Sequence, residues 1–222
     1  MKKKLLVLVA AVLAIAMAMS MCACGSTTTE KSEISASDSG NVISPLDSAY
    51  TVENLDDCTA NVSFTSEDFD WENNCVYATI YDVLTYDAVD VQSIEEGSVL
   101  ETGDGDVQVN TVTETDDGIL INEGEDNQQL LQPQDGGTYQ IVGDNDIRAM
   151  RLLGEAELTL ADDVVLHDRD NEDPNKVVDV STDKLKTYID GLTDTDAEFD
   201  PYSTTVVIEG GVVTEINRVW MP

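Results

Sequence analysis

Carboxylates are the side chains that dominate the chemistry available to this chain. The 222 residues include 45 Asp and Glu against 11 Lys and Arg, with a single histidine, His167. One histidine excludes metal sites built from several histidines and allows at most one Ser-His-Asp triad. The chain has no nucleophile elbow G-x-S-x-G, no phosphate-binding loop and no H-E-x-x-H helix. The sequence therefore predicts no catalytic residue, no metal ligand and no cofactor.

Two patterns among the acids leave alternatives open. From Asp168 onward, oxygen-bearing side chains occur at alternate positions, as at the start of a calcium loop. The sixth place holds Asp173 where such a loop needs glycine, and the twelfth holds Asp179 in place of a bidentate glutamate. A calcium-stabilised structural surface protein is one alternative function. Paired carboxylates can also hydrolyse glycosidic bonds without histidine, so a carbohydrate-active surface hydrolase is another.

Aromatic residues beside acids offer a further site for sugars. Tyr77 and Tyr81 are four residues apart, which places them on one face of a strand, and Trp71 precedes them. Asp70 and Asp82 flank this group. Rings edged by carboxylates suit carbohydrate binding, although aromatic residues in strands also serve as half-buried core.

The first residues predict the destination of the protein. Three lysines at residues 2–4 precede an uncharged apolar run of 15 residues, 5–19, which is shorter than the ~20 needed to span a bilayer. A basic start, a short apolar run and a small residue, Ala23, form a secretory signal peptide, predicted here as residues 1–23.

The cysteine that follows adds an anchor. Cys24 after Ala23 resembles the lipobox of bacterial lipoproteins of the Gram-positive type, although Met21 and Cys22 stand where that motif has Leu and a small residue. The resemblance implies that Cys24 carries a diacylglyceryl group and becomes the mature N-terminus on the extracytoplasmic face of the cell membrane. Residues 206–222 also resemble the ends of uncharacterised lipoproteins from Gram-positive anaerobes, which implies no known activity.

Composition divides the rest of the chain into a tether and one domain. Residues 24–47 are rich in Ser and Thr and predict a flexible lipid-anchored tether, followed by a single β-rich domain over residues 48–222. Removal of residues 1–23 takes away three lysines and no acid, which changes the net charge from −34 to −37. Such a charge repels nucleic acid and leaves cationic peptides, divalent cations or a carbohydrate as possible ligands. No oligomeric state is predicted.

The hydrophobic pattern predicts a mostly β fold, an antiparallel sandwich or a small barrel of short hairpin-linked strands. One helix is expected at residues 182–190, after Ser181 as its cap. Residues 89–100 resemble a strand, a tight loop and a second strand of a small barrel. Further strands are expected at residues 59–65, 76–85, 98–102, 107–114, 119–121, 138–142, 147–153, 156–160 and 164–167, with a final hairpin at 204–209 and 212–220.

Two cysteines remain after processing and lipidation. Cys58 and Cys75 flank residues 59–74, and the compartment permits oxidation, so the sequence predicts a disulfide between them. Taken together, the sequence predicts a membrane-anchored extracytoplasmic module that binds a partner or ligand without catalysis.

Overall fold

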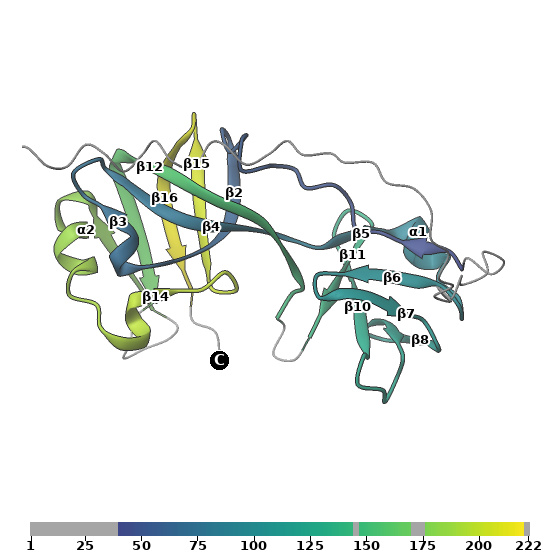
Figure 1. Cartoon of the computed structure of the whole chain (residues 1–222). Helices are drawn as coiled ribbons and strands as arrows, with labels where there is room; N and C mark the ends of the chain where they lie inside the picture. The colour runs from purple at the N-terminus through teal and green to yellow at the C-terminus, as the bar shows by residue number, and fades with distance from the viewer. Residues whose placement is uncertain (1–39, 144–146, 170–175, 220–222) are drawn as a thin grey trace, which may run out of the picture. The chain divides into compact units, whose positions relative to one another are not determined.

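The computed structural model describes residues 40–143, 147–169 and 176–219. Its main sheet closes on itself, because β12 pairs with β4 through its first half and with β16 through its second. The remaining pairs, β16 with β15, β15 with β2, and β2 with β4, complete a ring (Figure 1). The mostly β fold is confirmed, and five strands of its eight-stranded main sheet form a closed barrel. The barrel strands are β2 (Cys58–Thr65), β4 (Cys75–Val83), β12 (Met150–Arg169), β15 (Thr204–Glu209) and β16 (Val212–Arg218).

The connectivity of this barrel is specific. Around the ring, β2 is followed by β4, β12, β16 and β15. When the five strands are numbered in chain order, this spatial order is 1-2-3-5-4. All these pairs are antiparallel except β12 with β16, and helix α2 (Thr182–Ile189) lies between the third and fourth strands. This is the connectivity of the five-stranded Greek-key barrel known as the OB-fold.

Alternation along the strands fills the barrel and leaves a polar outer face. In β2, Ala60, Val62 and Phe64 are buried, while Asn61 and Ser63 between them are half-exposed. The predicted final hairpin is confirmed, with a turn at residues 210–211 where both backbone φ angles are positive, as glycine allows. The predicted helix is confirmed as α2, and it covers the core with Leu185 and Ile189.

A second hydrophobic core is formed mainly by residues inserted between β4 and β12, together with Ile43 of β1. Two sheets surround it, one of order β5-β11-β10-β9-β8 and a smaller one of order β1-β6-β7. Its elements are β1 (Val42–Ile43), β5 (Thr85–Asp87), α1 (Ala88–Gln92), β6 (Val99–Thr102), β7 (Gly105–Gln108), β8 (Val112–Thr115), β9 (Gly118–Ile121), β10 (Gln129–Gln134) and β11 (Thr138–Val142). The single predicted domain over residues 48–222 thus contains two separate cores.

Several predicted boundaries are corrected. The predicted tether ran to residue 47, but β1 pairs with β6 and Ile43 is only 1% exposed, because its side chain completes the second core. Residues 88–92 form helix α1 rather than a strand, since the Asp87 carboxylate accepts a hydrogen bond from the Val89 amide at 2.7 Å and caps it.

The three strands expected between residues 147 and 167 are one strand, β12, whose register with β4 shifts between Leu152 and Gly154. The strand expected at 107–114 is divided between β7 and β8, and the glutamine-rich β10 was not predicted. The remaining short elements are η1 (Ser66–Asp68), β3 (Phe69–Asp70), β13 (Val177–Ser181), η3 (Asp194–Ala197) and β14 (Glu198–Phe199). Among the described residues, no helix has the length and apolar character needed to cross a membrane.

Candidate functional site

A groove of about 700 Å³ lies on the outer face of the barrel, over β2, β4, β12 and β14. Its floor is made of hydroxyl-bearing residues, Ser63, Thr65, Tyr77 and Thr79. The volume is within the range of small-molecule sites.

Strand register explains why these side chains share one face. Ser63 pairs with Thr79, and Thr79 pairs with Glu155 on β12. Tyr77 pairs in the same way with Glu157. Because side chains alternate along a strand, residues two apart project to the same side, opposite to the core residues between them. Glu155 and Glu157 therefore form one wall of the groove.

The opposite wall comes from a segment that joins β2 on its other side. Glu198 in β14 pairs with Thr65, after which residues 200–203 leave the sheet before β15 resumes pairing. The Asp200 carboxylate accepts hydrogen bonds from the backbone amides of Tyr202 and Ser203 at 3.0 Å, and Asn61 Nδ2 donates to the Pro201 carbonyl at 2.9 Å. This turn carries Asp200 and Pro201 to the groove rim.

The groove is strongly acidic. Five carboxylates line it, and among the described residues its lining contains no Lys, Arg or His. Asp68 is occupied locally, since it accepts from the Thr65 amide at 2.6 Å and from the Thr65 hydroxyl at 2.8 Å. The other four, Glu155, Glu157, Glu198 and Asp200, are solvent-exposed, and no ion pair joins them to a described basic side chain. Of these four, Asp200 also has local donors, because it accepts from the Ser203 hydroxyl at 2.6 Å in addition to the two amides.

Tyr77 is the aromatic side chain of the groove floor that is accessible to a ligand. It is 49% exposed. The negative charge of Glu157 raises the pKa of its hydroxyl.

A buried ion pair between Arg218 and Asp168 holds the segment that forms the β14 wall. Arg218 and Asp168 are 2% and 0% exposed and form two hydrogen bonds of 2.6 Å. Arg218 also donates to the carbonyls of Asp196 and Glu198, at 2.6 and 3.2 Å, and its guanidinium carbon lies 4.0 Å from the centre of the Phe199 ring. The pair thus ties the barrel strands β12 and β16 to the segment that carries Glu198.

Tyr188 completes this network from helix α2. Its hydroxyl donates to Asp168 Oδ2 at 2.8 Å. Burial, followed by this bond to a carboxylate, raises the pKa of Tyr188 to about 12.

Two positions of the segment weighed as an alternative calcium loop have partners in the structure. Asp168 is buried against Arg218 and Tyr188, and Asp179 lies 2.7 Å from His167 Nδ1. Asp170 and Asp173 lie outside the described residues. Within the described part of the chain, no three potential ligands gather in a metal-binding group.

The predicted aromatic platform is only partly assembled. Trp71 stacks on Phe69 at 4.9 Å, and the ammonium of Lys186 lies 5.1 Å from the centre of its ring. Asp82 pairs with Arg151, and Asp70 accepts bonds from the residues that follow it. Tyr77 lines the groove, and the Tyr81 hydroxyl lies 3.4 Å from that of Ser63.

The structure does not bring Cys58 and Cys75 together, and both thiols are free. Each stands at the start of its strand, and β2 and β4 run antiparallel, so the two starts are at opposite ends of the pair. Cys58 is instead opposite Ile208, and Cys75 opposite Thr159. The expected disulfide is therefore not formed in this structure. Cys24 lies outside the described residues.

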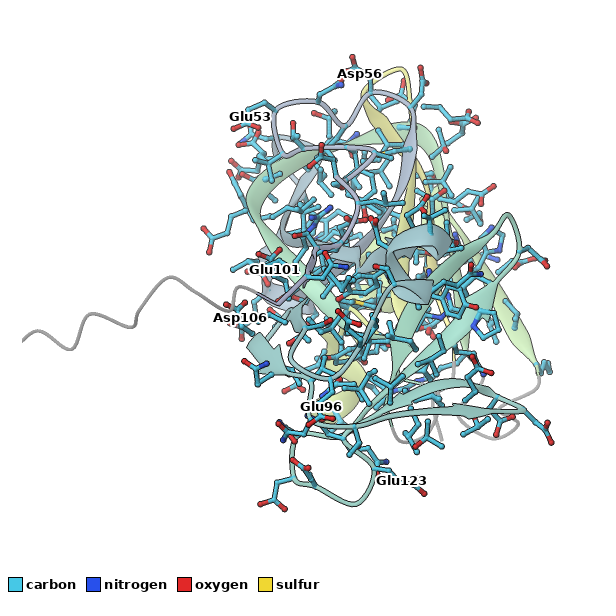
Figure 2. The ribbon with its side chains drawn as sticks, turned by 90° about the vertical axis from the view of Figure 1, so that its right-hand side faces the viewer. Glu53, Asp56, Glu96, Glu101, Asp106 and Glu123 are labelled. Atoms are coloured by element: carbon cyan, nitrogen blue, oxygen red, sulfur yellow. The ribbon has the colours of Figure 1, made fainter. Side chains whose placement is uncertain are left out.

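Carboxylates also lie elsewhere on the surface, and two of them, Glu101 and Asp106, are directly opposite each other in the β6–β7 pair. Figure 2 labels six acids of the loop before β2 and of the inserted segment. They are Glu53, Asp56, Glu96, Glu101, Asp106 and Glu123. The groove differs from this general acidity because its acids face one hollow from two sides.

The acids of the groove and Arg218 were not among the residues predicted from the sequence. Spacing alone places Glu155 with Glu157, and Glu198 with Asp200, on shared faces, but it does not bring the two pairs to one hollow. No family model, curated protein or solved structure matches this chain.

Proposed function

We propose that this protein is a membrane-anchored extracytoplasmic lipoprotein that binds a ligand in the barrel groove without catalysing a reaction on it. The observation that carries the proposal is the groove itself, with four exposed carboxylates from two walls over a hydroxyl-lined floor. Barrels of OB-type connectivity bind ligands on the face of their second and third strands, which are β4 and β12 here. That support is an analogy between folds.

The anchor part of the proposal rests on the N-terminal sequence. Two acyl chains on Cys24 would give stable attachment to the membrane. Cys24→Ser should therefore release the protein into the medium or leave it unprocessed. Membrane fractions that retain a normally trimmed Cys24→Ser protein would contradict the lipid anchor.

We propose no catalysis because none of the four exposed carboxylic acids of the groove has the apolar enclosure that a general acid needs. A glycosidase keeps one carboxylic acid protonated in an apolar enclosure. Glu155, Glu157, Glu198 and Asp200 are all in contact with solvent. The hydrolase alternative predicts turnover of an oligosaccharide, which a reducing-end assay detects.

Binding can be tested with three probes on the purified full-length protein in non-ionic micelles. The probes are a capped Ala-Lys-Lys-Ala peptide, an N-acetylglucosamine tetramer and calcium chloride, each followed by calorimetry. Thr79→Arg fills the groove floor with a cation, and Thr113→Arg is its matched control on β8, where the threonine is also half-exposed.

We expect at least one probe to bind saturably, and this binding to be lost in Thr79→Arg and kept in Thr113→Arg. Absence of saturable binding by all three, or equal loss in both variants, would refute the groove as a binding site.

A further inference from the structure

The two acidic walls are too far apart for one small cation. β14, β2, β4 and β12 are successive neighbours, so the strands that carry Glu198 and Glu157 are three strand spacings apart. At ~4.8 Å per spacing, this is about 14 Å along the sheet. Within the described residues the acids of the two walls form no metal-binding group, and at this strand spacing two separated charges match the two walls better than one small cation does.

We propose that the ligand is an extended peptide segment with two adjacent basic residues, lying between the walls. In an extended chain, neighbouring side chains point to opposite sides. Two neighbouring lysines therefore hold their ammonium groups on the order of 12 Å apart, one directed to each wall. This inference rests on the proposed function and names its ligand class.

The floor of the groove suits a peptide backbone. The Thr79 hydroxyl can donate a hydrogen bond to a peptide carbonyl, a group that a linear polyamine lacks. The Ser63 hydroxyl, which donates to Tyr81, can accept a hydrogen bond from a peptide amide. The half-exposed ring of Tyr77 can interact with an alkylammonium or guanidinium group that passes over it. The volume of about 700 Å³ has room for several residues.

The charge of the groove also decides against other ligands. Phosphates of nucleic acid would face carboxylates on both sides, and among the described residues the lining offers no cation to meet them. A neutral sugar would leave four carboxylates without counter-charge. Charge complementarity therefore favours the dibasic peptide.

Calorimetry with matched peptides tests this inference on the full-length protein. Capped Ala-Lys-Lys-Ala is compared with capped Ala-Lys-Ala-Ala, with spermidine and with the N-acetylglucosamine tetramer. Glu157→Gln and Glu198→Gln each neutralise one wall, and Glu96→Gln removes the same charge from the inserted segment, where Glu96 is exposed (Figure 2).

We expect the dibasic peptide to bind more tightly than the monobasic one. Each wall variant should weaken dibasic binding by about two- to fivefold, the scale of an exposed ion pair, and reduce the preference for two lysines. Glu96→Gln should change affinity less than either wall variant.

Three results would overturn the inference. They are equal affinity for both peptides, equal losses in all three variants, and tighter binding of spermidine than of the dibasic peptide. Groove-dependent binding of the sugar without the peptide would refute the ligand class and leave the binding function standing, whereas no groove-dependent binding of any probe would refute both.

Discussion

Removing the buried arginine should be the most damaging single change in this barrel. Arg218→Met deletes two bonds of 2.6 Å to Asp168, two bonds to backbone carbonyls and the contact with Phe199. The carboxylate left behind is 0% exposed, and among the described residues it keeps Tyr188 and one backbone amide as donors. Breaking a buried pair in this way costs ~3–5 kcal/mol.

A matched control is present in the same chain. Arg151→Met breaks a pair of 2.7 Å with Asp82, but those side chains are 27% and 17% exposed, and water can replace part of the contact. We expect a loss of about 1 kcal/mol there. Urea unfolding followed by circular dichroism measures both free energies of unfolding, and thermal melting should show about 2–4 °C per kcal/mol for a domain of this size.

A double variant separates two contributions to the loss of stability, the unpaired charge of Asp168 and the lost packing of Arg218. Arg218→Met with Asp168→Leu removes both charges, so stability should recover part of the loss seen with Arg218→Met alone. If Arg218→Met costs no more than Arg151→Met, or if the double variant is no more stable than the single one, the account of the buried pair is wrong.

Other predictions concern titration, thiols, capping and cations. Burial raises the pKa of Tyr50 and Tyr188 to about 12, above the usual 10.0, so the unfolded chain loses these protons at lower pH than the folded protein does. The free energy of unfolding should therefore fall as pH rises from 10 to 12. Tyrosinate absorbance should show that these two hydroxyls ionise late. Burial also raises the pKa of Cys58 and Cys75, so both should react slowly with maleimide, and intact mass should not change on reduction. Asp87→Ala should cost ~1 kcal/mol by removing the cap of α1, measured by urea unfolding. Calcium and magnesium should raise the melting temperature by similar amounts without saturation below millimolar concentration; saturable micromolar calcium binding would contradict diffuse charge relief.

The sequence by itself determined the local features of this protein. Alternating apolar residues such as Ala60, Val62 and Phe64 defined a strand and its inward face, and the paired glycines at 210–211 defined a hairpin. Helix α2 was predictable from the spacing of Leu185 and Ile189. These features depend on residues within a few positions of one another, which is the range over which backbone propensity and periodicity act.

Strand pairing, the groove and the buried charges were decided only by the tertiary structure. Ser63, Glu155 and Glu198 meet at one hollow because β2 pairs with both β4 and β14, and β4 with β12. Arg218 and Asp168 are 50 residues apart. The direction of the strands likewise separates Cys58 from Cys75, which sequence proximity had suggested to be partners. The physical reason is that neighbouring strands are selected by burial of a shared core across long sequence separations, which no local pattern encodes.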